Sequence, residues 1–392
     1  MTDSTPDPAP RGYLDAASVA PLHPRGREAL LAALDEGWAD PRRLHHEGRT
    51  ARLLLEGARE AIAAVLGAGT EEVGFTGSHS AAVHAAVLGV RAARRRTGAV
   101  TVASAVEHSA VLHAAKHTPA GGPGSEPAGQ CRLVAVDRLG RVDVDSFAAA
   151  LSPADVALAC LQSANGEVGT VQPVEAVADA CARAGVPLLV DAAASAGHLP
   201  TPPGWQLLTA DPRSWGGPAG VGILVVRAGA RWTSTAPEDD DTERTPGAVA
   251  VPQALAAAAA LQAVAADAGA RRDRHAMVER IRRAAAALPD TEVAGDPDRR
   301  LPHVVTFSCL YADGESLVGE LDRCGLAVGS GSACTAASLQ PSHVLAAMGL
   351  LTHGNLRIGL PVGVDPATVE ALCDRLPGAL ATVRAMLGAD HL

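Results

Sequence analysis

The chain has 392 residues, a formal net charge of −10 and 47% hydrophobic residues, which is enough for two domains with a substantial core. No segment is dominated by lysine or arginine and no apolar run reaches the ~18 residues of a membrane span, which excludes nucleic acid and membrane as expected partners. The N-terminus lacks the pattern of a secretory signal, and seven cysteines show no metal-ligand spacing. We therefore expect a cytoplasmic protein from a reducing compartment, with no metal site.

Short apolar runs alternate with stretches of helical periodicity through the first two thirds of the chain. This alternation predicts an α/β protein whose mostly parallel sheet is covered by helices on both faces. Functional groups should then gather at the carboxyl ends of the strands. The expected strands are 99–103, 132–136, 156–161, 186–190 and 222–226, and the expected helices are 80–93, 109–117, 145–150 and 174–184.

The acidic stretch 236–245 interrupts the pattern, and helices are expected at 252–267 and 272–288. A smaller α+β unit should follow, with strands at 303–309 and 355–359. Its expected helices are 315–323, 341–350 and a last one from Pro366. The predicted organisation is a disordered tail over 1–12, a large domain over 13–252 and a small C-terminal domain over 253–392.

Two residues of the small domain are candidates for chemistry. Cys334 lies in the Gly/Ser/Ala-rich stretch 329–334, which suits a thiol that must swing between partners. The alternative is a small residue in a tight turn. Arg357 lies inside an apolar strand, where it needs a carboxylate partner, either from a ligand or from the fold itself.

Three residues of the large domain are also candidates. Asp191 ends an apolar strand, which is a ligand position in open α/β sheets, although a helix N-cap explains it equally well. His108 opens a helix and either faces the ligand or is only a polar helix start. Ser80 belongs to a Gly/Ser segment, 75–80, at a helix start, which suits a phosphate or plain capping.

Taken together, these segments resemble the cysteine desulfurases of the class V aminotransferase group, which are fold-type I enzymes that use pyridoxal phosphate (PLP). The similarity runs from Tyr13 to the last helix, with the matching pieces in the order found in that family. The stretch around Cys334 resembles the branch with a flexible cysteine loop. The matching segments are 44–49, 75–80, 107–112, 165–170, 190–192, 217–222, 330–335, 341–345 and Arg357.

The resemblance implies a fold-type I PLP-transferase-like fold and a chemistry in which PLP on a lysine helps a cysteine remove sulfur from L-cysteine, leaving alanine and an enzyme persulfide. It also implies a homodimer and a sulfur acceptor protein. It assigns persulfide formation to Cys334, binding of the substrate carboxylate to Arg357 and stacking on the cofactor ring to His108. It assigns pairing with the ring nitrogen to Asp191, phosphate binding to Ser80 and contact with the ring to Asn165.

The lysine of the family is missing. Ser214 stands at its position, and a serine can neither form an imine nor shuttle a proton as an amine does. The chain contains one lysine, Lys116, which is expected near the far end of the helix that follows His108.

Further departures concern the same cofactor. Asp211 replaces a phosphate-binding serine, and like charges ~4 Å apart at an effective dielectric of ~20 repel by about 4 kcal/mol. Arg213 replaces a histidine at the phosphate and offsets part of this repulsion. Ala194 replaces a glutamine that bonds the PLP phenol oxygen, and Ala248 replaces a threonine of the partner subunit, just after the acidic residues 238–241.

Three hypotheses follow. The first is a cysteine-desulfurase-like sulfur-transfer protein, with a persulfide on Cys334, that cannot run Schiff-base turnover alone and serves as a carrier or as the partner of an active paralogue. The second is a cysteine desulfurase that holds PLP without a covalent bond, so PLP is expected to be weak, non-covalent or absent. The third is a pocket repurposed for another small molecule. The expected partners are L-cysteine or a persulfide donor, and a second subunit that is identical or a paralogue.

Overall fold

The computed structural model describes residues 12–117, 129–151, 155–235, 248–330 and 341–388. A seven-stranded sheet forms the larger part of the molecule, in the order β1-β7-β6-β5-β4-β2-β3. The pairs from β6 to β3 are parallel, and only β7 runs against its neighbours, so the predicted mostly parallel sheet is confirmed. The strands are β1 (Val73–Thr76), β2 (Val100–Ser104), β3 (Gln130–Val134), β4 (Val156–Gln162), β5 (Leu188–Asp191), β6 (Leu207–Ala210) and β7 (Gly222–Val226).

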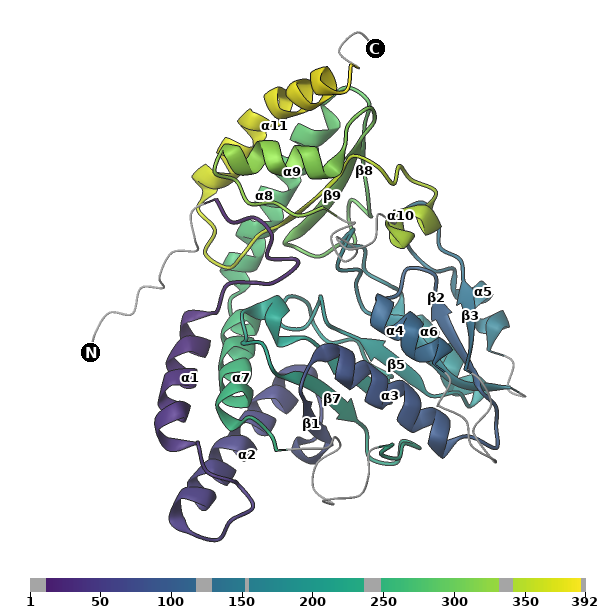
Figure 1. The fold of residues 1–392 in the computed structure, drawn as a ribbon. Coiled ribbons are helices and arrows are strands. Elements are labelled where there is room, and N and C mark those ends of the chain that lie inside the picture. Colours follow the sequence, from purple (N-terminus) through teal and green to yellow (C-terminus); the bar gives the residue numbers. More distant parts are fainter. Residues whose placement is uncertain (1–11, 118–128, 152–154, 236–247, 331–340, 389–392) are drawn as a thin grey trace.

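Helices cover both faces of this sheet (Figure 1). The central strands are apolar throughout, because successive side chains point to opposite faces and both faces are buried. In β4, Leu158 and Cys160 pack with the helices of one face, while Ala159 and Leu161 pack with those of the other. The first face carries α3 (His79–Ala93) and α4 (Ser109–Lys116), and the second carries α2 (His46–Leu66), α5 (Val144–Ala150), α6 (Val174–Ala184) and α7 (Val251–Ala266).

A second, smaller unit lies beyond one edge of the sheet, at the top of Figure 1. Its own apolar core includes Phe307 and Leu372, and Leu14 joins this core from the N-terminal end of the described chain. The backbone N–H of Leu14 donates to Ala327 O at 2.8 Å, which ties that segment to the small unit. The elements are β8 (Thr291–Val293), β9 (Val304–Cys309), β10 (Asn355–Gly359), α8 (Ala268–Ala286), α9 (Gly314–Arg323), α10 (His343–Met348) and α11 (Pro366–Met386).

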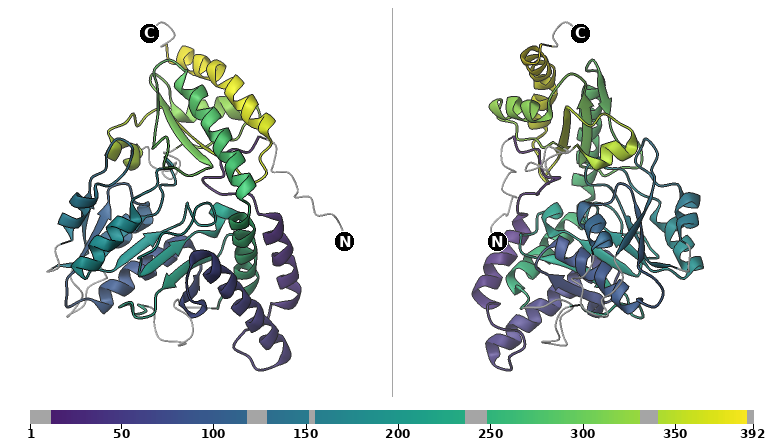
Figure 2. Two further views of the ribbon diagram at one scale, coloured as in Figure 1. Left: turned by 180° about the vertical axis from the view of Figure 1, so that it is seen from behind. Right: turned by 45° about the vertical axis from the view of Figure 1, so that its right-hand side comes forward.

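Helix α1 (Pro24–Glu36) packs along α7, and together with α2 it forms a projection at one corner of the molecule (Figures 1 and 2). Two short 3-10 helices, η1 (Thr70–Glu72) and η2 (Pro212–Trp215), complete the list of elements. Among the helices that the structure describes, none is long and apolar enough by itself to cross a membrane. Only α7 and α8 taken together reach that length and composition, and they are bent by 73° at their junction.

Candidate active site

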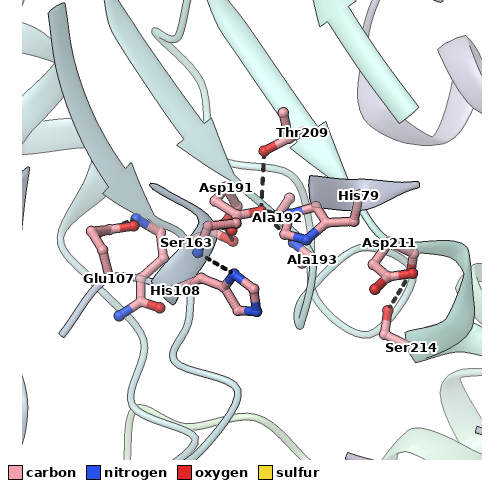
Figure 3. A network of polar contacts seen from close by, with 12 residues as sticks. His79, Glu107, His108, Ser163, Asp191, Ala192, Ala193, Thr209, Asp211 and Ser214 are labelled. Atoms are coloured by element: carbon pink, nitrogen blue, oxygen red, sulfur yellow. Dashed lines mark hydrogen bonds and ion pairs between the residues drawn. The ribbon is translucent and has the colours of Figure 1, made fainter. Parts of the chain in front are cut away.

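Polar side chains gather where five strands of the large sheet end. Strands β2, β4, β5 and β6 are parallel, and β1 runs in the same direction as β6 because both are antiparallel to β7. Their carboxyl ends therefore meet at one edge of the sheet, where open α/β folds bind ligands. The residues brought together there include His79, His108, Ser163, Asp191 and Asp211 (Figure 3).

Asp191, the last residue of β5, is the centre of this network and is only 4% exposed. Its Oδ1 accepts hydrogen bonds from His79 Nε2 at 2.9 Å, from Thr209 Oγ1 at 3.1 Å and from the backbone N–H of Ala193 at 3.1 Å. Although burial works to raise the pKa of Asp191, the charge and hydrogen bond of His79 lower it below its usual value. Asp191 is therefore a buried, ionised carboxylate.

His79 is a central residue of this site that the sequence did not single out. It is the first residue of α3, is 3% exposed, and lies 112 positions from Asp191 in the chain. Burial works to lower the pKa of His79, but the adjacent Asp191 carboxylate raises it above its usual value. The two side chains thus form a buried imidazolium–carboxylate pair, with the ring N–H donating to the carboxylate.

His108 lies against His79, with ring centroids 5.2 Å apart and the ring planes at 72°. It is the N-cap residue of α4, and its Nδ1 accepts the backbone N–H of Ala110 at 3.1 Å. His108 is exposed to solvent as a residue, while partial desolvation of its ring lowers the pKa of His108 below its usual value. His108 is therefore a neutral ring that faces the same site as the charged His79.

Glu107 is fully buried beside the same network. Its Oε1 accepts the backbone N–H of Gln162 at 2.8 Å, while Oε2 has no hydrogen-bond partner among the described residues. Burial raises the pKa of Glu107 to about 8. At neutral pH this side chain is mostly a neutral carboxylic acid, so folding at that pH takes up a proton.

Replacing Glu107 with Gln should stabilise the protein by about 3 kcal/mol at pH 7. The pKa of Glu107 is about 8 in the folded protein and 4.5 ordinarily, so the wild type loses stability as the pH rises from 4.5 to 8 and the amide does not. Denaturant unfolding of both proteins at pH 5 and pH 8 measures the difference. It should be small at pH 5 and largest at pH 8, and a variant that is less stable than wild type at pH 8 would contradict the neutral-acid state.

Ser214 lies in η2, next to the end of β6, and both of its polar oxygens are engaged. Its Oγ donates to Asp211 O at 2.9 Å, and its carbonyl oxygen is 3.0 Å from Nε2 of the buried His198. Trp215 fixes the same turn to α7 by donating its ring N–H to Ala257 O at 3.0 Å. The position thus holds a well-fixed hydroxyl and no amine.

Arg213 and Asp211, which the sequence placed near a phosphate, are paired with each other. Arg213 Nη2 lies 2.7 Å from Asp211 Oδ2, and Arg213 Nε lies 3.2 Å from both carboxylate oxygens. Asp211 also accepts the backbone N–H of Arg213 at 3.0 Å. The charges of Arg213 and Asp211 therefore compensate each other within the chain, and Arg213 already has an anionic partner.

Lys116 lies far from this edge of the sheet. It is the exposed last residue of α4, whereas His108 caps the first turn of the same helix. Seven residues of helix separate Lys116 from the start of α4, which corresponds to ~10 Å along the axis. The only lysine of the chain is thus at the opposite end of the helix from the site.

Ser80 and Asn165 lie at the ends of β1 and β4, but their side chains differ in surroundings. Ser80 is exposed in the first turn of α3, whose N-cap is Ser78, since Ser78 Oγ accepts the N–H of Ala81 at 3.1 Å. Asn165 is buried, and its Oδ1 accepts the N–H groups of Glu167 and Val168, both at 2.8 Å. This oxygen organises its own loop, and a ring contact by Asn165 stays a prediction.

Arg357 lies in β10 and is 7% exposed. Its Nη2 donates to Ser18 Oγ and lies 3.6 Å from Asp15 Oδ1, so both neighbours come from the N-terminal segment. Its Nε is buried and has no hydrogen-bond partner among the described residues. The ion pair is long and leaves one donor for a further acceptor. Cys334 lies outside the described residues.

The chain matches the family model "Aminotransferase class-V" over residues 12–372. It is 33% identical to a cysteine desulfurase of Cereibacter sphaeroides, covering 97% of this chain and 99% of that protein. It is 34% identical to an IscS-like cysteine desulfurase of Mycobacterium tuberculosis, covering 95% of this chain and 97% of that protein.

Solved structures agree on the fold. A NifS-like protein superposes with a TM-score of 0.85 at 23% identity, covering 95% of this chain and 100% of that one. A NifS-like protein from Rickettsia africae gives a TM-score of 0.82 at 19% identity, covering 96% of this chain and 100% of that one. The predicted fold-type I architecture is thus confirmed, and the chain belongs to the aminotransferase class-V family as a cysteine-desulfurase-like protein.

Proposed function

We propose that this chain is a sulfur-transfer protein that carries a persulfide on Cys334 and does not run Schiff-base turnover with PLP by itself. The observation that carries the proposal is that a serine, Ser214, stands where the family has its PLP-binding lysine. A serine hydroxyl donates there to a backbone carbonyl, and the only lysine lies at the far end of α4. Without an amine, the site has no group that can condense with the aldehyde of PLP.

The residues around Ser214 also do not fit PLP. The cysteine desulfurases pair the ring nitrogen of PLP with the aspartate at position 191, and here that carboxylate already accepts the N–H of His79. Arg213, at a phosphate position of the family, is bound to Asp211. The cofactor would therefore meet two polar groups that already have partners within the chain.

The chemistry left to such a protein is exchange of sulfur between thiols and persulfides. The Cys334 thiolate attacks the outer sulfur of a persulfide donor, a new S–S bond forms, and the donor leaves as its thiolate. The reverse reaction on an acceptor thiol returns Cys334 to its starting state, so no oxidant or reductant is consumed. Arg357, with its free Nε, would hold the carboxylate of a small donor derived from L-cysteine.

The direct test is a comparison of L-cysteine with a protein persulfide as sulfur source for the purified chain. With L-cysteine and added PLP, we expect neither sulfide release nor alanine formation above a protein-free control. With a persulfidated cysteine desulfurase as donor, we expect labelling of Cys334. A yellow protein that releases alanine from L-cysteine would refute the proposal.

A second subunit, identical or a paralogue, is part of the proposal. Large apolar side chains are exposed on the projection formed by α1 and α2 and its connecting loop, including Leu34 (52% exposed), Trp38 (69%) and Leu53 (68%). Apolar patches of this kind are typical of protein–protein interfaces.

The double substitution Leu34→Glu and Leu53→Glu should shift the protein from dimer to monomer in analytical ultracentrifugation, because it places two charges in an apolar contact. Leu133→Glu is the matched control, since Leu133 is 48% exposed on β3, away from the projection. An equal shift for both variants, or none for either, would place the interface elsewhere.

A further inference from the structure

His79 touches both groups that the resemblance assigns to the cofactor ring. Its Nε2 donates to Asp191 Oδ1 at 2.9 Å, and its ring lies edge-on to His108 with 5.2 Å between centroids. In the cysteine desulfurases the same two positions pair with the pyridine nitrogen and stack on the pyridine face. One side chain of this protein therefore contacts the same two residues that a bound pyridine ring would contact, although it meets His108 with its edge (Figure 3).

The chemical match is close. A protonated pyridine offers a carboxylate one charged ring N–H in the plane of an aromatic ring, and an imidazolium offers the same. Asp191 Oδ1 already has two further donors, Thr209 Oγ1 and the N–H of Ala193, both at 3.1 Å. A second charged ring donor at this oxygen would thus compete with His79 and with both of these donors.

Displacing His79 is unfavourable because the pair is buried. His79 is 3% exposed and Asp191 is 4% exposed, so a ligand that breaks the pair leaves the imidazolium without its counter-charge in a desolvated place. That penalty subtracts directly from the affinity of the ligand. It corresponds to a loss of about 100-fold or more in the binding constant.

We propose that His79 is an internal occupant of the pyridine position and the side chain that selects against PLP at this site. This inference rests on the proposed function and extends it, because it adds a second barrier to PLP beside the missing lysine. Restoring an amine at position 214 should then fail to restore a cofactor site as long as His79 stays in place.

The experiment compares the wild type with four variants: Ser214→Lys alone, His79→Ala alone, the two combined, and His84→Ala combined with Ser214→Lys as the matched control. His84 lies on α3 like His79, but its ring neighbour is His117, with centroids 6.5 Å apart. Each protein is titrated with PLP by calorimetry and followed by its visible absorption, then reduced with borohydride and weighed by mass spectrometry. These readouts do not depend on turnover.

We expect the combined His79→Ala and Ser214→Lys protein to bind PLP about 100-fold or more tightly than Ser214→Lys alone and to give a reduced covalent adduct at the amine introduced at position 214. The control pair should behave like Ser214→Lys alone. If removal of His79 leaves the protein unfolded, as judged by circular dichroism, His79→Ser replaces it, since a hydroxyl and water can still solvate Asp191. Ser214→Lys alone binding PLP as tightly as the combined variant would overturn the inference. Tight covalent binding by the wild type would instead refute the proposed function.

Discussion

Asp191→Ala should lower the free energy of unfolding by about 3–5 kcal/mol, because it leaves the buried His79 without its counter-charge. Asp191 is 4% exposed and His79 is 3% exposed, so little water reaches the pair. Chemical denaturation of the cofactor-free protein measures the loss. The matched control is Asp211→Ala, whose partner Arg213 is 44% exposed, and there the loss should stay below about 1 kcal/mol.

The loss of unfolding free energy in Asp191→Ala depends on pH, and the pKa shifts of His79 and Asp191 fix the direction of that dependence. The pKa of His79 is raised above 6.5, so its contribution is complete below pH 6.5 and is lost as the pH rises through its folded value. The pKa of Asp191 is lowered below 3.8, so its contribution is present above pH 3.8 and is lost as the pH falls through its folded value. The effect of Asp191→Ala should therefore be greatest between about pH 4 and pH 6.5.

The double variant with His79→Ala and Asp191→Ala completes this test. Removing both charges leaves an apolar gap but no unpaired ion, so the double variant should be more stable than Asp191→Ala alone. Strictly additive losses would mean that the two side chains do not interact, and the ion pair would then have no part in the site.

The second large effect is expected at Cys334. Incubated with a persulfidated donor protein, the wild type should gain about one sulfur atom per chain, seen as a mass increase of about 32 Da that a reducing thiol removes. Cys334→Ser should reduce this gain to the background level. Cys324 is the exposed cysteine among the described residues, so Cys324→Ser is the matched control and should keep the full gain.

If both cysteine variants take up sulfur equally, the acceptor is another thiol and Cys334 is only inherited from the family. The buried thiols are poor alternatives, since burial raises the pKa of Cys160 and of Cys181 and keeps both protonated. Cys160 lies in β4 and Cys181 in α6, and both are buried.

The sequence predicted most of the architecture because its elements are strongly patterned. The expected strand 222–226 coincides with β7 and the expected helix 174–184 with α6. The expected strand 186–190 corresponds to β5 at Leu188–Asp191, a difference confined to its ends. Strands β1 and β6 and the helices α1 and α2 were missed.

The site was only partly predictable, and the reason is physical. Asp191 and His108 could be identified because Asp191 ends an apolar strand and His108 opens a helix, and both are local patterns. The contact of His79 with Asp191 spans 112 positions and depends on β1 and β5 ending at the same edge of the sheet. The residues around a histidine at a helix start do not indicate such a long-range contact. The contact can be predicted only when the order of the strands in the sheet is known.

The charges of Asp211 and Arg213 illustrate the same limit. Their types alone suggested repulsion of a phosphate with partial compensation. The geometry shows a closed ion pair, with 2.7 Å between Arg213 Nη2 and Asp211 Oδ2. The two residues are two positions apart at the start of η2, so their side chains pair with each other within the chain.

The central claim is that Lys116, the one lysine of this polypeptide, is not placed to condense with PLP beside Ser214. The most direct measurement is the mass of the intact protein after incubation with equimolar PLP and borohydride reduction, made in parallel on Lys116→Arg, which has no lysine at all. We expect unmodified mass for both proteins, and no visible absorption band before reduction. One PLP bound covalently per chain, at Lys116 or at any other group, would contradict the account.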